Sequence, residues 1–103
     1  MDKSNFTADT RYSVTLKEAG GRLRPANIYV HRLFDDYMIA RRIDGAQLGM
    51  LFKIPYKDIV RIVRTIPVAD QERFMLPDAM LNPKVWETRD SMMAYGSSPG
   101  LGK

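Results

Sequence analysis

The residues best suited to chemistry lie together in the short stretch FDDYMIARR. Asp35 and Asp36 are typical of a turn, because short carboxylate side chains accept hydrogen bonds from nearby backbone amides. Tyr37 follows the turn directly, and Arg41 and Arg42 close the apolar run behind it. An aromatic ring and two guanidinium groups in this order can form a platform for a flat, negatively charged ligand. The same residues also fit an ordinary hairpin with a cross-strand tyrosine and solvated arginines.

The rest of the sequence contains no set of residues typical of a catalytic or metal-binding site. His31 is the single histidine and the chain has no cysteine, which excludes disulfides, thiolate metal sites and thiol nucleophiles. We expect His31 to be a partly buried strand residue, since no second histidine or carboxylate pair accompanies it. The glycine pair in AGGRLRP lacks the spacing of a phosphate-binding loop and indicates a turn. We therefore expect a protein that is not an enzyme and that needs no cofactor or metal.

Composition and charge indicate one globular domain with a basic centre. The chain has 103 residues, 45% of them hydrophobic, and no apolar run of the roughly 20 residues that span a bilayer. With no secretory leader evident, we expect a cytoplasmic protein that does not associate with membranes. Residues 11–64 hold eleven Lys and Arg against five Asp and Glu. This excess favours a polyanionic partner, although a solvated basic face would give the same count.

The middle of the chain has the period-two pattern of β-strands. Apolar and polar residues alternate in RYSVTLK, and residues 27–34 form a strand with apolar side chains on both faces, which predicts partial cover on both sides. Residues 59–66 fit a helix or a strand, and we favour a closing strand because an open sheet exposes an edge. The strands are expected at 11–17, 27–34, 37–43, 48–54 and 59–66. Together they predict a mainly β protein whose small antiparallel sheet bends or closes into a barrel.

The C-terminal part is expected to be helical. Asn82 is a good N-cap and Pro83 suits the first helical position, so a helix is predicted over about 83–95. Its amphipathic stripe, which includes Trp86, is expected to pack on the barrel or a neighbouring subunit, or to bind a protein partner. The predicted organisation is a flexible N-terminus (1–10), the barrel (11–67), an extension with the helix (68–95) and a flexible tail (96–103).

These motifs resemble those of the Sm and Sm-like family, including its bacterial Hfq-like branch. The order VTLK, a glycine turn, RLRP and FDDYMI resembles the first Sm motif. IPYKDIVRIV is similar to the second motif of the bacterial branch, with Tyr56 and Lys57 at the first two positions of its Tyr-Lys-His turn and Asp58 at the third. The resemblance covers roughly residues 12–64, about half of the chain.

The resemblance implies a small, strongly bent, five-stranded SH3/Sm-like barrel that assembles edge to edge into a homo-oligomeric ring and binds single-stranded RNA. In such a ring Tyr37 would stack on a base, Lys57 would supply a hydrogen bond or charge, and the arginines would contact phosphates. The implied RNA-binding residues are Tyr37, Lys57, Tyr56, Arg41 and Arg42. The IPY-x-x-I pattern also resembles the final strand of pleckstrin-homology-like domains. A protein-interaction or structural barrel without nucleic-acid binding is therefore the alternative.

Overall fold

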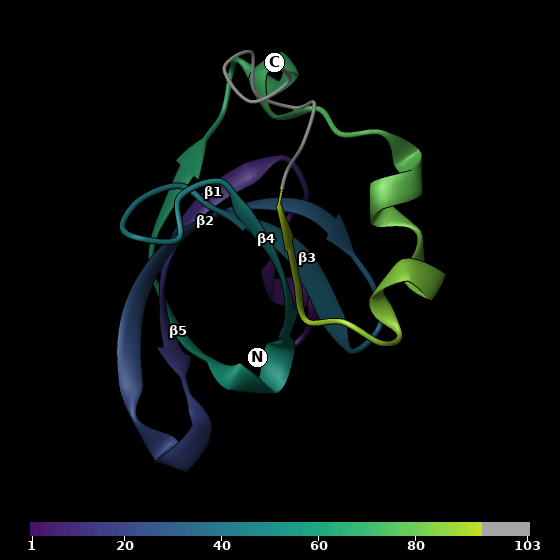
Figure 1. Cartoon of the computed structure of the whole chain (residues 1–103). Helices are drawn as coiled ribbons and strands as arrows, with labels where there is room; N and C mark the ends of the chain where they lie inside the picture. The colour runs from purple at the N-terminus through teal and green to yellow at the C-terminus, as the bar shows by residue number, and fades with distance from the viewer. Residues whose placement is uncertain (94–103) are drawn as a thin grey trace.

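One antiparallel β-sheet makes up most of the protein (Figure 1). The computed structural model describes residues 1–93. The strands are β1 (Thr10–Lys17), β2 (Leu23–Leu33), β3 (Tyr37–Arg42), β4 (Met50–Pro55), β5 (Ile59–Pro67) and β6 (Ser91–Met93), in the sheet order β5-β1-β2-β3-β4-β6. Short 3₁₀ turns connect or follow them: η1 (Lys3–Asn5), η2 (Ala19–Gly21), η3 (Tyr56–Asp58), η4 (Gln71–Phe74), η5 (Asp78–Leu81) and η6 (Pro83–Trp86). The five predicted strands are confirmed, including the choice of strand for residues 59–66.

The predicted five-stranded barrel is wrong. Within residues 1–93 the sheet has six strands, of which β5 and β6 are the two edges, and it does not close. Figure 1 shows that the sheet bends strongly. The physical reason is that β6 takes the open edge of β4, where Leu51 pairs with Met92 and Phe52 with Ser91. The backbone groups of β4 are satisfied in this way, so no pairing between β4 and β5 is needed.

The edge strand β5 is irregular. Its register against β1 shifts between Ser13 and Val14 and again between Thr15 and Leu16, so Val63 and Val60 have no residue opposite them. Both valines are well exposed, at 61% and 48%. Bulges of this kind bend and twist an edge strand.

The predicted C-terminal helix over 83–95 is also wrong. Only the turn η6 is helical, and the chain then extends into β6; residues 94 and 95 lie outside the described residues, as does the predicted tail 96–103. The start signals act as expected, since the Asn82 side chain accepts a hydrogen bond from the backbone amide of Lys84 at 2.9 Å and Pro83 occupies the first position.

The turn stops at Trp86 because tertiary contacts outweigh the start signals. Trp86 is fully buried, and its indole Nε1 donates to the backbone carbonyl of Met80 at 2.8 Å. The residues that follow include Thr88 and Asp90, which are weak helix formers. The backbone amide of Lys53 in β4 donates to the carbonyl of Asp90 at 3.0 Å, which leads the chain onto the sheet edge.

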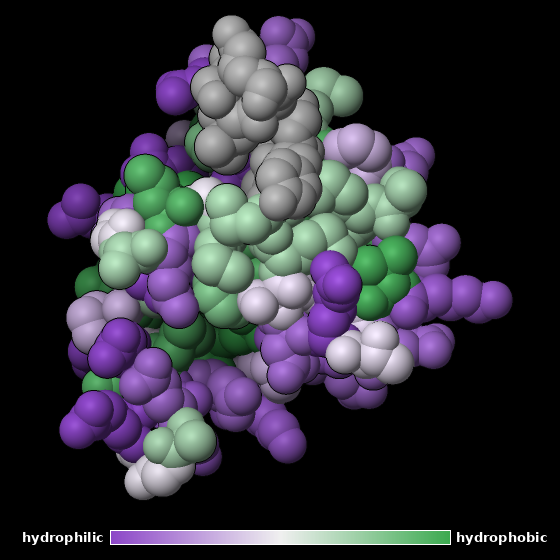
Figure 2. Space-filling model, in the orientation of Figure 1, coloured by the Kyte–Doolittle hydropathy of each residue, from purple (hydrophilic) through white to green (hydrophobic). Residues whose placement is uncertain are grey.

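Two apolar cores lie on opposite faces of the sheet. The inner core fills the concave face with residues from β1 to β5 and with Phe6, whose ring packs 5.2 Å from that of Tyr12, so the N-terminal segment contributes to the interior. The outer core lies under η5 and η6 and contains Ile39, Leu51, Leu81 and Trp86. Figure 2 shows hydrophobic residues gathered at the centre of the view, where β4 and β6 lie in Figure 1, with hydrophilic residues around them. None of the helical turns within residues 1–93 is long and apolar enough to cross a membrane.

Candidate functional site

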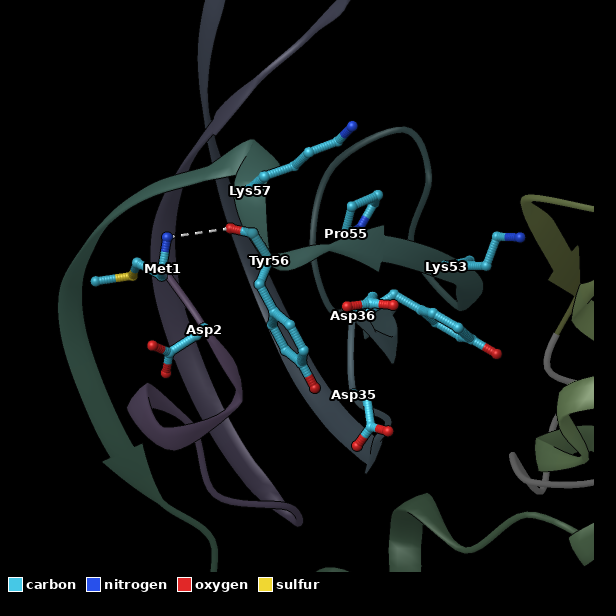
Figure 3. A pocket seen from close by; sticks show the side chains of 9 residues that line it. Met1, Asp2, Asp35, Asp36, Lys53, Pro55, Tyr56 and Lys57 are labelled. Carbon is cyan, nitrogen blue, oxygen red and sulfur yellow. Dashed lines mark hydrogen bonds between the residues drawn. The ribbon is translucent and has the colours of Figure 1, made fainter.

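A pocket of about 530 Å³ lies where β3 begins and β4 ends (Figure 3). Three of the five predicted RNA-binding residues, Tyr37, Tyr56 and Lys57, line it. The complete lining consists of Met1, Asp2, Asp35, Asp36, Tyr37, Lys53, Pro55, Tyr56 and Lys57. The dashed line in Figure 3 marks the hydrogen bond that the Met1 nitrogen donates to the Tyr56 carbonyl at 3.4 Å, which ties the N-terminal segment to the pocket wall.

Tyr37 is half-buried and already has partners for its ring. The ring of Phe34 stacks on it with centroids 5.0 Å apart, and the Lys53 ammonium lies 5.4 Å from its centroid. Lys53 is held there because its Nζ also donates to the Trp86 carbonyl at 2.7 Å. Little of the Tyr37 ring is therefore free as a platform for a base.

Tyr56 belongs to the inner core. Its side chain is buried, its ring stacks on Phe6 at 5.9 Å, and its hydroxyl donates to the Phe34 carbonyl at 2.6 Å. Burial raises the pKa of the Tyr56 hydroxyl above its usual value. The group is thus a structural donor at the base of the pocket, whereas Lys57 is exposed at the rim.

The charges around the pocket nearly cancel. Asp2, Asp35 and Asp36 stand against Lys53 and Lys57. Hydrogen bonds from the Ser4 hydroxyl and amide lower the pKa of Asp2, so this carboxylate stays ionised. No group of three acidic or histidine side chains in residues 1–93 could hold a metal ion. A polyanion would meet as much repulsion as attraction here.

The two predicted arginines point to opposite faces of β3. Arg41 is buried on the outer face, where its Nε donates to His31 Nε2 at 3.2 Å and its Nη2 to the Phe74 carbonyl at 3.1 Å. Arg42 is half-buried; its Nη1 donates to Gln47 Oε1 at 3.0 Å, and its Nη2 forms a salt bridge with Asp44 at 3.7 Å. The structure therefore does not bring the five predicted residues together into one site.

Four other cationic side chains do share one surface. In β1, Arg11 and Lys17 alternate with core residues and so face outward. In β5, Arg61 lies opposite Thr15 and Arg64 lies opposite Ser13, and directly opposed residues of an antiparallel pair present their side chains on the same face. We call this surface the basic strip: Arg11, Lys17, Arg61 and Arg64.

The basic strip has no carboxylate partners among the residues that the structure describes. Its four cations take part in none of the salt bridges there, which instead join pairs such as Arg24 with Glu18 and Arg73 with Asp70. The Nε of Arg11 is buried and finds no hydrogen-bond partner in residues 1–93. Asp44, on the β2 side of the basic strip, accepts a hydrogen bond from Asn27 and forms a salt bridge with Arg42.

The sequence patterns did not predict the basic strip. The alternation in RYSVTLK already places Arg11 and Lys17 on the polar face of a strand. What it lacks is the register between β1 and β5, which are separated by about half of the chain and which bring Arg61 and Arg64 alongside.

Comparisons with protein-family models, with curated proteins and with solved structures find no match to the chain. The resemblance to the Sm-like family therefore rests on its short motifs alone.

Proposed function

We propose that the protein is a non-catalytic module that binds single-stranded RNA through the RNA backbone, with the basic strip as its contact surface. The observation that carries this proposal is the alignment of four cations that have no carboxylate partner within residues 1–93. Three of them, Lys17, Arg61 and Arg64, are exposed. Each phosphate that a side chain neutralises releases condensed counterion, which drives association. The half-buried hydroxyl of Thr15, opposite Arg61, adds a neutral donor for phosphate oxygens.

Phosphate contacts, rather than stacking on Tyr37, supply the affinity in this proposal. The Tyr37 ring already contacts Phe34 and Lys53, and the pocket in front of it carries three carboxylates. Lys57 is exposed in η3, directly before β5, and remains a further candidate phosphate contact. A backbone-directed site of this kind predicts weak sequence preference.

The proposal includes assembly into a homo-oligomeric ring and a cytoplasmic location. Because β6 covers the edge of β4, the open sheet edges within residues 1–93 belong to β5 and β6, and a ring would pair β5 of one copy with β6 of the next. Light scattering across the micromolar range tests this arrangement, and a monomer at every concentration contradicts it. A protein partner at the predicted helix is not proposed, because that helix does not form.

Binding of a labelled oligouridylate, followed by fluorescence anisotropy, tests the RNA proposal. We expect the double variant Arg61→Ala/Arg64→Ala to bind about tenfold or more weakly, since a hydrogen bond to a charged group contributes about 1.5 kcal/mol or more. The matched control is Lys3→Ala/Arg24→Ala, which removes the same charge from side chains that already have carboxylate partners, Asp35 and Glu18. The proposal fails if the native protein shows no binding at low salt, or if the control loses as much affinity as the test variant.

A further inference from the structure

The side chain of Phe74 fills a slot on the outer face of β2 and β3. The Tyr29 ring stacks on it with centroids 4.1 Å apart and an interplanar angle of 14°. The Arg41 guanidinium carbon lies 5.3 Å from the Phe74 centroid, and Arg41 Nη2 donates to the Phe74 carbonyl at 3.1 Å. A flat ring is thus held by an aromatic face, a cation and a hydrogen-bond donor.

The walls of the slot are fixed independently of Phe74. The Tyr29 hydroxyl donates to Asp9 Oδ1 at 2.7 Å, and the His31 ring packs against Tyr29 edge to face at 4.9 Å. His31 Nε2 in turn accepts a hydrogen bond from Arg41 Nε at 3.2 Å. Tyr29 and Arg41 therefore keep their positions through contacts within the sheet and with the N-terminal segment.

The slot is continuous with the basic strip. Arg11 is the cross-strand partner of Tyr29, and Tyr29 is the partner of Arg41, so the three side chains form one row across β1, β2 and β3. Directly opposed residues lie about 5 Å apart in an antiparallel sheet. A strand of RNA whose phosphates follow the basic strip would pass beside this row.

The segment that covers the slot is weakly held. Phe74 is half-buried, residues 69–73 are exposed and Met75 is 68% exposed. The backbone hydrogen bonds of η4 are long, at 3.4 Å from Arg73 to Asp70 and 3.3 Å from Met75 to Glu72. Segments with few buried contacts and exposed backbone hydrogen bonds open locally at low free energy.

We propose that Tyr29 and Arg41 form a nucleobase site that Phe74 occupies in the closed state. When η4 lifts, a base of the bound strand takes the place of the Phe74 ring, stacking on Tyr29 beside the Arg41 guanidinium. Arg41 Nη2, released from the Phe74 carbonyl, then donates to a carbonyl oxygen of the base. This inference rests on RNA binding at the basic strip and adds to it a base contact that Phe74 regulates.

Phe74→Ala removes the ring that competes with the base, so it should raise affinity for oligouridylate about tenfold, in line with one added stacking contact. Inorganic polyphosphate, which has no bases, should bind the native protein and the variant equally. Met75→Ala is the matched control, because it shortens an exposed neighbour that has no part in the slot. Circular dichroism and thermal unfolding establish whether each variant is folded. If Phe74→Ala does not fold, Phe74→Leu replaces it in the test, because leucine keeps an apolar cover but cannot stack. Phe74→Leu should show a smaller gain in affinity for oligouridylate than the one expected for Phe74→Ala.

A further variant tests whether the gain in RNA affinity comes from stacking on Tyr29 or from a general loosening of the fold. Phe74→Ala/Tyr29→Leu keeps apolar volume at position 29 but removes the stacking face, and it should lose the gain in RNA affinity. Equal RNA affinity of the native protein and Phe74→Ala, or an equal gain for polyphosphate, overturns the nucleobase site while leaving binding at the basic strip intact. If the native protein and the variant both fail to bind RNA, the nucleobase site and the proposed function fail together.

Discussion

The two halves of the outer sheet face differ in whether another segment of the chain covers them. Over β2, β3 and β4 the outward side chains include Tyr29, Ile39 and Leu51, and the segment after β5 folds back to cover them. Over β1 and β5 the outward side chains include Ser13 and Arg64, and this half stays open. Apolar residues at alternate positions require a cover, whereas charged and hydroxyl residues do not. One sheet face therefore supports a structural half and a half that is free to bind.

Trp86→Ala should have the largest effect, because it removes the main side chain of the cover. Trp86 is fully buried against Ile39 and Leu51 and donates to the Met80 carbonyl. We expect the free energy of unfolding to fall by about 3–5 kcal/mol, as for other buried tryptophans. Urea denaturation measures the loss, with the half-buried neighbour Val85→Ala as a control that should lose less. A loss under about 1 kcal/mol for Trp86→Ala would mean that the cover contributes little to the fold.

Acid should destabilise the covered half through His31. Burial, and then the neighbouring Arg41 guanidinium, lower the pKa of His31 from 6.5 to about 3. Below pH 6.5 the unfolded chain binds a proton that the folded chain does not, so stability from this group is complete above 6.5 and is lost as the pH falls toward 3. The slope approaches about 1.4 kcal/mol per pH unit.

Urea denaturation of the native protein and of His31→Gln over the same pH series isolates this contribution. Glutamine can still accept a hydrogen bond from Arg41 but does not titrate, so the native protein should lose stability relative to the variant as the pH falls. Parallel pH profiles would show that His31 is not buried as a neutral acceptor. Tyr29 and Arg41 are the titratable groups packed against it, and Arg41 stays cationic across this range.

Arg61→Ala/Arg64→Ala should have the smallest effect on stability. Both side chains are exposed and form no salt bridge within the described part of the chain, so the free energy of unfolding should change by no more than about 0.5 kcal/mol. Thermal and urea unfolding measure this. A fall of about 2 kcal/mol in the free energy of unfolding would instead mean that the two arginines stabilise the fold.

The sequence predicted the strands well because their side-chain pattern is local. The alternation in RYSVTLK predicts a strand with one polar face. The apolar residues on both faces of 27–34 predict a strand that is partly covered on both sides. The partial cover of β2 on both sides is confirmed by Phe74 stacked on Tyr29. Local signals also located the start of η6 at Asn82 and Pro83.

The remaining features depend on long-range contacts that no local pattern encodes. β6 is only three residues long, too short for a periodic signal, yet it blocks the edge of β4 and prevents the predicted barrel. The basic strip needs the register between β1 and β5, and the slot needs Phe74, which lies in a segment without periodicity. The motif around Tyr37 lies at a pocket whose charges nearly cancel. Asp2 contributes to this balance, and its position beside the pocket depends on a long-range contact that the motif does not encode.

The salt dependence of RNA affinity tests the central claim most directly. If the four cations of the basic strip each neutralise a phosphate, the logarithm of the association constant should fall with the logarithm of salt concentration at a slope of roughly −3, from about 0.7 per contact on a single strand. Arg61→Ala/Arg64→Ala should make that slope shallower by about 1.4, while Lys3→Ala/Arg24→Ala leaves it unchanged. An affinity that does not depend on salt, or a slope that the loss of Arg61 and Arg64 does not alter, would contradict phosphate binding on the open half of the sheet.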